Sequence, residues 1–165
     1  MRRFGVLIAS LALLSLTGCF YSFAGGGLPP HIHTMAIATF DNQTPSPDLP
    51  KELYDKMRTE LQKHLGVRDA PQDRADAFIH GTITSFDADV PVGFSANPQQ
   101  AVSARRRLQV TVDVEILDQS NGKPLYTGKG LRMEADYAER AEPDGRAQAI
   151  DKIVQKIIEG VQQNW

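Results

Sequence analysis

The sequence predicts an α+β domain in which two amphipathic helices pack on one face of a four-stranded, mostly antiparallel sheet, in the order β-α-β-β-β-α. Two observations support this prediction. Apolar and polar residues alternate strictly over residues 108–116, which is typical of a strand with one buried and one exposed face. Residues 49–65 and 144–164 repeat apolar side chains at helical spacing, and such helices bury their apolar stripe against a sheet.

Composition limits the classes of partner. The chain has 165 residues, which fits one domain after a leader, and it carries 18 Lys and Arg against 20 Asp and Glu. Because residues 1–18 contain two basic and no acidic residues, the remainder has a net charge of −4. An acidic domain binds a phosphate backbone poorly, so we expect no nucleic-acid partner. The single cysteine excludes an internal disulfide.

Residues 1–18 have the parts of an export signal. Arg2 and Arg3 give a positive start, residues 4–16 are apolar and uncharged, and Leu16-Thr17-Gly18-Cys19 follows. This tetrapeptide resembles the lipobox of bacterial lipoproteins, whose cysteine receives lipid after the leader is cleaved. The apolar stretch is too short for a retained span, which needs roughly 20 residues. We therefore predict a signal peptide over 1–18 and attachment of palmitate-type acyl chains at Cys19.

Residues 19–33 predict a flexible, lipidated tether. Three glycines at 25–27 are permissive, and Pro29-Pro30 imposes an extended path. His31 and His33 form a pair that could bind a metal, but the sequence supplies no further ligands at a suitable spacing. We interpret them as polar residues of the tether and expect no metal and no cofactor. The domain is then expected to cover residues 34–165.

The first strand and helix are marked by their ends. Residues 34–40 predict a strand, and turn-forming residues at 41–45 end it. Asp48 or a neighbouring residue is expected to cap a helix over 49–65, with Pro50 in the first turn and Gly66 after the last. Beyond it we predict a polar loop over 67–76, a strand over 77–86 and a long loop over 87–104.

The clearest local prediction is a hairpin around Asn121-Gly122, the strongest short turn signal in the chain. A two-residue loop pairs residues whose numbers sum to 243. The apolar pairs are then Leu108 with Ala135, Val110 with Met133 and Val112 with Leu131, and the polar pairs are Arg107 with Asp136 and Thr111 with Arg132. One mismatch, Lys129 opposite Val114, predicts a bulge near Gly128 or Gly130.

The basic run at 105–107 has two interpretations. It could be a charged strand entrance that resists edge pairing. Alternatively, Arg105, Arg107 and Arg132, which share the polar sheet face, contact anionic groups, since guanidinium forks suit phosphates. Glu134 and Asp136 lie on the same face and weaken its positive field, so such a site would be local.

Catalytic patterns are missing from the sequence. It contains no nucleophile elbow and no P-loop pattern. Asp87 and Asp89 could act as paired carboxylates, but nothing beside them marks an acid of raised pKa, and a solvated strand end is the simpler interpretation. We expect a protein that is not an enzyme.

Several segments resemble one family, the lipopolysaccharide-assembly lipoproteins LptE. The likeness is sharpest at Phe40-Asp41-Asn42-Gln43-Thr44 and extends over nearly the whole chain. The other similar segments are 18–23, 28–29, 34–37, 75–77, 81–86 and 108–118. Phe20 departs from the glycine that is common after the cysteine in this family.

The resemblance implies two helices on a four-stranded sheet and a function in the outer membrane. LptE-like lipoproteins lie on its periplasmic face, inside the β-barrel translocon LptD, as a plug and assembly aid while lipopolysaccharide passes. On this view Arg105, Arg107 and Arg132 are candidates for lipopolysaccharide contact. Two alternatives remain: another periplasmic lipoprotein of β-α-β topology, such as an activator of a cell-wall synthase, or a small hydrolase using Asp87 or Asp89.

Overall fold

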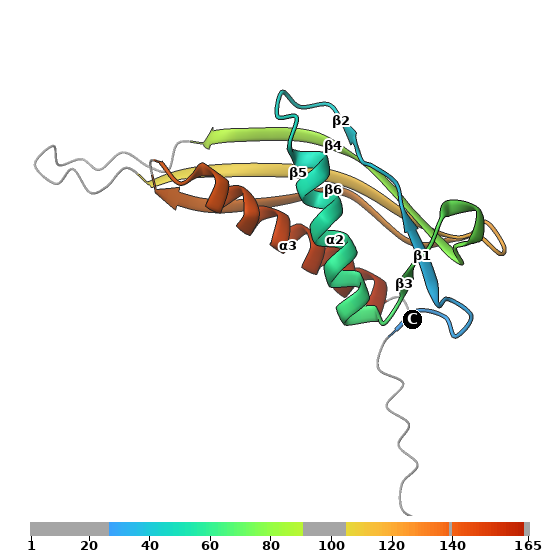
Figure 1. Cartoon of the computed structure of the whole chain (residues 1–165). Helices are drawn as coiled ribbons and strands as arrows, with labels where there is room; N and C mark the ends of the chain where they lie inside the picture. The colour runs from blue at the N-terminus through green and yellow to red at the C-terminus, as the bar shows by residue number, and fades with distance from the viewer. Residues whose placement is uncertain (1–26, 91–104, 139, 164–165) are drawn as a thin grey trace, which may run out of the picture.

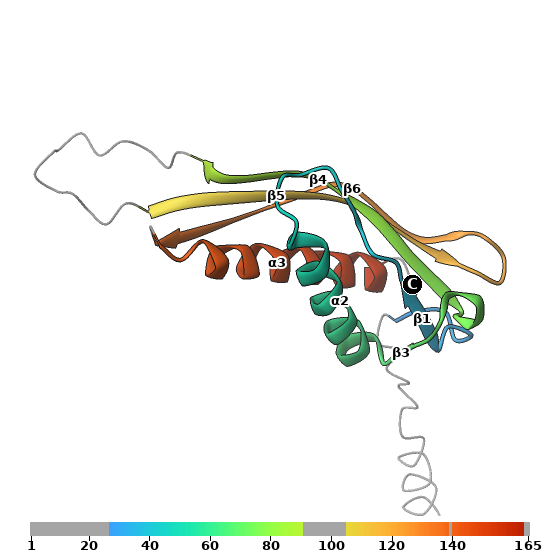
Figure 2. The same ribbon diagram turned by 45° about the horizontal axis from the view of Figure 1, so that its top comes forward.

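The computed structural model describes residues 27–90, 105–138 and 140–163. Two helices lie on the same side of a long, twisted sheet (Figures 1 and 2), which confirms the α+β class. We call the helix-covered side of the sheet its inner face and the opposite side its outer face. The end of the sheet where β5 leads into β6 and where β1 begins is called the base.

The sheet has six strands among the described residues, not the four that were predicted. They are β1 (Thr34–Ile37), β2 (Asp41–Asn42), β3 (Arg68–Asp69), β4 (Ala77–Val90), β5 (Arg105–Asp118) and β6 (Pro124–Ala138). Their order is β3-β1-β4-β5-β6, and β2 pairs with β4. The short strands pair in parallel, whereas β4, β5 and β6 are antiparallel. The count was wrong because β2 and β3 have two residues each, too few to show a period.

Three predicted boundaries also change. The first strand ends at Ile37 and not at residue 40. The predicted loop over 67–76 contains β3 and a short 3-10 helix, Gln72–Arg74. Strand β4 continues to Val90, so the first four residues of the predicted 87–104 loop are strand. The rest of that loop, 91–104, lies outside the described residues.

The β5–β6 register confirms the predicted pairing over its distal half. Leu108 faces Ala135, Val112 faces Leu131 and Arg107 faces Asp136. A register shift between Val112 and Val114 gives the expected bulge, and Gly130 has the positive φ of +61° that favours glycine. Val114 consequently faces Gly128, so the predicted mismatch with Lys129 disappears.

The hairpin loop itself is longer than the predicted two residues. Strand β5 ends at Asp118, whose backbone N–H donates to the carbonyl of Lys123 at 2.9 Å. Gly122 donates its N–H to the Asp118 carbonyl at 2.8 Å. A second register shift, between Ile116 and Leu117, acts together with the bulge between Val112 and Val114 to compensate for the longer loop. The distal register is therefore the predicted one although the loop length was wrong.

Helix α2 (Leu49–Leu65) has the predicted bounds. Its buried residues recur every fourth position, as the stripe predicted: Leu49, Leu53, Met57 and Leu61. Gly66 ends the helix in the left-handed conformation, with φ of 67°. Asp48 differs from the prediction, because its carbonyl accepts from the Glu52 N–H but its side chain makes no capping bond.

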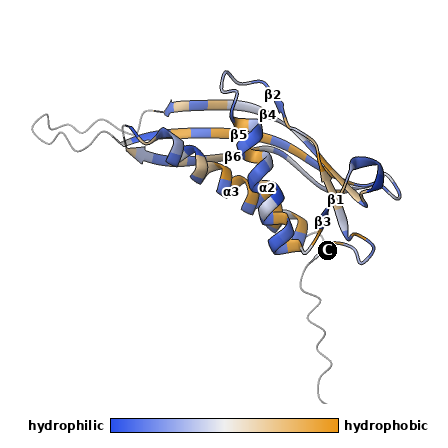
Figure 3. Cartoon of the chain, viewed as in Figure 1, coloured by the Kyte–Doolittle hydropathy of each residue, from blue (hydrophilic) through white to orange (hydrophobic). Residues whose placement is uncertain are grey.

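Helix α3 (Glu142–Gln163) begins two residues before the predicted start. Its buried residues are Gly145, Ala149, Ile150, Ile153, Val154, Ile157, Ile158 and Val161. Ala147, which was predicted for this face, is exposed. Apolar and polar stretches alternate along both helices (Figure 3), as expected for helices that bury one side. No helix in the described residues combines the length and hydropathy needed to cross a membrane.

Polar bonds join the two helices to each other, and another joins strands β4 and β6. Arg146 of α3 reaches Glu52 of α2 at 2.9 Å, and Lys56 of α2 reaches Asp151 of α3 at 2.9 Å. On the inner face the Tyr137 hydroxyl of β6 donates to the Ala88 carbonyl of β4. None of these bonds involves the outer face, which is the side of the sheet that the helices leave uncovered.

The residues before β1 are not a free tether over their whole length. Pro29 and Ile32 are buried, and Leu28 packs against the core cluster. The Ile32 N–H donates to the Pro29 carbonyl at 2.9 Å, which closes a turn. The predicted tether ran to residue 33, whereas contact with the domain begins by residue 28. Residues 19–26, with Cys19, lie outside the described part.

Candidate functional site

The outer face of β4, β5 and β6 is mostly polar, as predicted. Alternation places one set of side chains on the helices and the other on this face. The inner residues of β5 are almost fully buried, and Leu108, Val112 and Ile116 have no exposed area. The outer residues along β5 are Arg107, Gln109, Thr111, Asp113, Glu115 and Leu117. Near the base the face becomes apolar, because Leu117 pairs with Phe78 of β4.

Arg107 is the most heavily engaged cation of the outer face. Its Nε donates to Asp136 Oδ1 at 2.6 Å, and its Nη1 lies 3.3 Å from Glu134 Oε2. The bond to Asp136 raises the pKa of the Arg107 guanidinium. The predicted cross-strand partner is thus the observed one. A phosphate that approached Arg107 would have to compete with two carboxylates.

Arg132 and Arg105 lie on the same face by register. Arg132 pairs with Thr111 across the strands. When the Gln109 side-chain amide is oriented with its oxygen toward Arg132, the Nη2 and Nε of Arg132 donate to that oxygen at 3.0 and 3.1 Å. Arg105 starts β5 opposite Ala138 and alternates with Arg107. The Arg105 side chain lies outside the described part of the structure. The three predicted arginines therefore share one face, and Arg132 is held by a neutral partner.

Two further acidic residues of the outer face, Glu115 and Asp113, also have partners. His80 Nε2 lies 3.2 Å from Glu115 Oε2, and the Asp113 carboxylate accepts the Gly130 N–H at 2.6 Å beside the bulge. The face therefore carries both signs of charge in local pairs. Such a surface is suited to a polar partner of mixed charge and not to bulk attraction of anions.

Asp87 and Asp89 do not form a catalytic pair. The Asp89 N–H donates to Asp87 Oδ1 at 3.1 Å, and the Asp89 carboxylate accepts from Arg106 Nη1 at 2.8 Å. Both residues are exposed near the end of β4. Asp89 is thus engaged in an ion pair, and the geometry matches the solvated strand end and not a pair of carboxylates facing a common substrate, which disfavours the hydrolase alternative.

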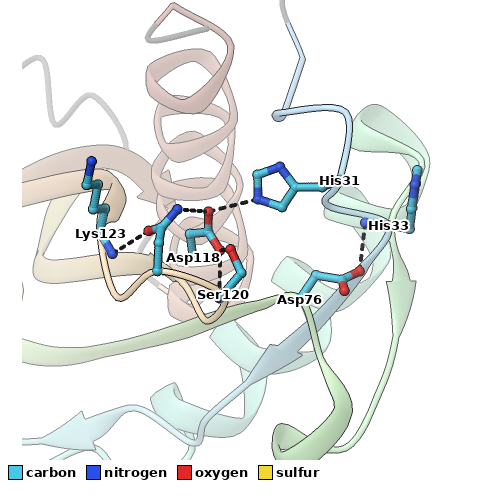
Figure 4. Close-up of polar contacts among 7 residues, drawn as sticks. His31, His33, Asp76, Asp118, Ser120 and Lys123 are labelled. Atoms are coloured by element: carbon cyan, nitrogen blue, oxygen red, sulfur yellow. Dashed lines mark hydrogen bonds and ion pairs between the residues drawn. The ribbon is translucent and has the colours of Figure 1, made fainter.

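The base of the sheet holds a polar cluster that sequence reasoning missed (Figure 4). We call it the base cluster, and its members are His31, Thr34, Asp76, Asp118, Ser120 and Asn121. Asp118 is buried, and hydrogen bonds from Ser120 lower the pKa of its carboxyl to about 2 against the opposing effect of burial. The Asp118-x-Ser120-Asn121 sequence reads as an ordinary turn, and no local pattern indicates that His31 completes it.

The two tether histidines have different environments. The His31 ring lies 2.8 Å from Asp118 Oδ2, whereas the His33 ring points away from the cluster (Figure 4). His33 bonds through its backbone: its N–H donates to Asp76 at 2.9 Å, and its carbonyl accepts the Arg68 N–H at 3.0 Å. Across the described residues, no three His, Cys, Asp or Glu side chains are grouped so that they could hold a metal ion.

Comparisons with known proteins give one family. The family model described as LptE, lipopolysaccharide-assembly, matches residues 32–161. This range includes all six strands and both helices, except for the last two residues of α3. No curated protein matches the chain. The match begins at Ile32, the buried residue next to His31.

Solved structures share the fold at low identity. The PelC dodecamer from Paraburkholderia phytofirmans has a TM-score of 0.52 and 16% identity, covering 82% of this chain and 93% of that one. A Xanthomonas campestris protein has a TM-score of 0.53 and 9% identity, covering 83% and 91%. The uncharacterized lipoprotein B from Nitrosomonas europaea has 0.51 and 14%, covering 88% and 90%. At these identities the likeness concerns the fold alone.

Proposed function

Because this chain belongs to the lipopolysaccharide-assembly family LptE, we propose that it is a lipid-anchored periplasmic subunit of the outer-membrane lipopolysaccharide translocon. In this role it plugs the LptD-type β-barrel and assists its assembly. It carries out no chemical step, and its partners are the barrel, lipopolysaccharide and the membrane that holds its lipid. The family match over residues 32–161 is the observation that carries the proposal.

The uncovered outer face supports a lodging role. One side of the sheet is closed by two helices, while the other offers polar and locally paired charges over three long strands. The interior of a large membrane barrel is polar, so such a face can contact it without burying unpaired charge. We propose that the outer face meets the barrel wall.

The lipid anchor supports the location. The lipobox-like segment ends at Cys19, and several acyl chains, each CH₂ worth about 0.8 kcal/mol on burial, hold a protein stably where one chain does not. We propose that cleavage before Cys19 and acylation place the domain at the periplasmic side of the outer membrane.

Lipopolysaccharide contact is assigned to Arg105, Arg107 and Arg132. Arg132 is the best placed of the three, since the Gln109 amide that holds it is neutral, whereas Arg107 is opposed by Glu134 and Asp136. A phosphate can share an already ordered guanidinium fork. We expect contact at a local site and not along the whole face.

Two experiments test the proposal. Metabolic labelling is expected to place palmitate on the native chain and not on Cys19→Ser. Affinity purification of the carboxyl-terminally tagged chain from native membranes is expected to recover an LptD-type barrel. Recovery of a peptidoglycan enzyme without the barrel would instead favour the cell-wall activator alternative and contradict the translocon assignment.

A third experiment tests the arginines. The triple variant Arg105→Ser, Arg107→Ser and Arg132→Ser is expected to bind lipopolysaccharide at least threefold more weakly. Its control removes the same charge elsewhere, at Lys51, Lys63 and Arg74, which are exposed and belong to other elements. Unchanged binding by the arginine variant, or an equal loss in the control, would refute the assignment.

A further inference from the structure

The residues that lead into β1 are fastened to the base of the domain. Asp118, with 3% of its side chain exposed, accepts from the Ser120 N–H at 2.8 Å, from Ser120 Oγ at 2.6 Å and from Asn121 Nδ2 at 2.7 Å. This network fixes the carboxylate in the β5–β6 loop. Its second oxygen also meets His31 Nε2 at 2.8 Å, so a preformed acceptor receives the incoming chain.

A second carboxylate holds the next residues. Asp76, just before β4, accepts from the backbone N–H of His33 at 2.9 Å and of Thr34 at 2.8 Å. The Thr34 hydroxyl donates to the same oxygen at 2.8 Å and accepts the Asp76 N–H at 3.0 Å. Two carboxylates from separate parts of the chain therefore bind three of the four residues 31–34: Asp118 binds His31, and Asp76 binds His33 and Thr34.

The base cluster also links these attachment points to each other. The Gln119 side-chain amide donates to the carbonyls of Gln72 and Ala75 at 2.9 and 3.0 Å, and the Gln119 N–H donates to the Asp76 carbonyl at 2.8 Å. The loop that carries Asp118 and the segment that carries Asp76 thus form one support. Burial of Pro29 and Ile32 adds apolar contact to the polar bonds.

We propose that Asp76 and Asp118 act as a lock that keeps residues 28–34 on the domain and so sets how far the domain can move from its lipid anchor. This inference rests on the proposed acylation of Cys19. The segment that the lock holds is residues 28–34 of the same chain. The distance that it limits is the one between the domain and the membrane surface. The outer-face function uses none of these residues.

Chain length gives the size of the effect. With the lock closed, the covalent path from Cys19 to Leu28 spans at most about 30 Å, at roughly 3.3–3.6 Å per residue. With residues 28–34 released, the path to Met35 spans at most about 55 Å. The difference is about half the length of a 14-residue strand such as β5, at roughly 3.4 Å per residue. A shorter tether raises the effective concentration of the domain at a membrane-embedded partner.

The lock is expected to stay closed over the ordinary pH range. Backbone and side-chain hydrogen bonds from His33 and Thr34 lower the pKa of Asp76, and those from Ser120 and His31 lower the pKa of Asp118. Both carboxyls therefore remain ionised acceptors. Opening then depends on competition for the bound segment and not on a proton.

The test uses the full-length acylated protein in vesicles of phosphatidylethanolamine and phosphatidylglycerol. The double variant His31→Ala and Thr34→Val removes three side-chain hydrogen bonds and keeps a β-branched residue in β1. Its control is His33→Ala, which removes an adjacent imidazole that makes no bond in the lock. Hydrogen exchange is expected to be at least tenfold faster at amides 32–34 in the double variant and unchanged in the control. Unaltered protection in β4–β6 shows that the variant is folded.

A second readout measures reach. A dye on Lys123→Cys, at the exposed base loop, transfers energy to acceptor-labelled lipids. We expect lower transfer efficiency in the double variant than in the native chain or in His33→Ala. A less disruptive variant, Asp76→Asn, is expected to show a smaller change in the same direction.

The outcomes separate the lock from the proposed function. Equal exchange at amides 32–34 in the double variant and the native chain would overturn the lock, whatever the protein does in the membrane. Faster exchange with unchanged transfer would overturn the claim about reach. Absence of acyl chains on Cys19 would overturn the anchor on which both the reach and the proposed function depend.

Discussion

The two ends of the β5–β6 hairpin use acidic residues in opposite ways. At the base, Asp118 is buried and accepts from Ser120, Asn121 and His31. Farther along the hairpin, Asp136 is 43% exposed and pairs with Arg107 on the outer face. The buried carboxylate has its partners fixed by the loop around it, whereas the exposed pair is screened by water. We therefore expect loss of the buried carboxylate to cost more stability than loss of the exposed one.

The largest expected difference between the two regions is in the stability that is lost when the carboxylate is removed. Asp118→Ala is expected to lower the free energy of unfolding by about 3 kcal/mol, the order of loss found when one partner of a buried, hydrogen-bonded charge pair is removed. Asp136→Ala is expected to cost less than a third of that. Urea unfolding followed by circular dichroism measures both. Equal losses would contradict the distinction between the two regions.

Acid is expected to act first on stability through the base. Asp118 has a pKa of about 2, below its ordinary value of 3.8, so its ionised form is stabilised by folding. This contribution is complete above about pH 4 and is lost as the pH falls toward 2. The lowered pKa of Asp76 acts in the same direction. Unfolding curves between pH 5 and 2 should therefore show a smaller decline in Asp118→Ala than in the native chain.

A change on the outer face is expected to affect binding more than stability. Asp136→Asn removes the carboxylate that would compete most closely with a phosphate for Arg107, and it keeps the shape of the side chain. We expect about a twofold to threefold tighter association with lipopolysaccharide, equivalent to well under the 1.4 kcal/mol of a tenfold change. Weaker association would show that Arg107 acts only as half of an ion pair.

The most accurate fold predictions came from segments in which the apolar periodicity and the charges of facing residues indicate the same register over many positions. The alternation at 108–116 and the charge match of Arg107 with Asp136 fixed the distal register, although the loop is longer than Asn121-Gly122 suggested. Helix α2 was predicted within its observed bounds because Pro50 and Gly66 mark both ends. Two-residue strands carry no period, so β2 and β3 were missed.

The site was predicted less completely for a physical reason. The outer-face arginines follow from strand alternation, which is local. The base cluster joins His31 to Asp118 and Thr34 to Asp76, pairs that are 87 and 42 residues apart. Turn residues such as Asp118 and Ser120 are common in exposed loops, so their composition gives no indication of burial. The amino-terminal segment reaches these residues only in the folded sheet, where β1 pairs with β4.

Photo-crosslinking in cells tests most directly whether the outer face meets a translocon barrel. A photoreactive residue at Thr111, in the middle of the outer face, is compared with one at Lys156, on the exposed side of α3. The account predicts a light-dependent adduct with an LptD-type barrel that is stronger from Thr111 than from Lys156. Absence of the barrel from the Thr111 adducts, or their replacement by a peptidoglycan enzyme, would contradict it.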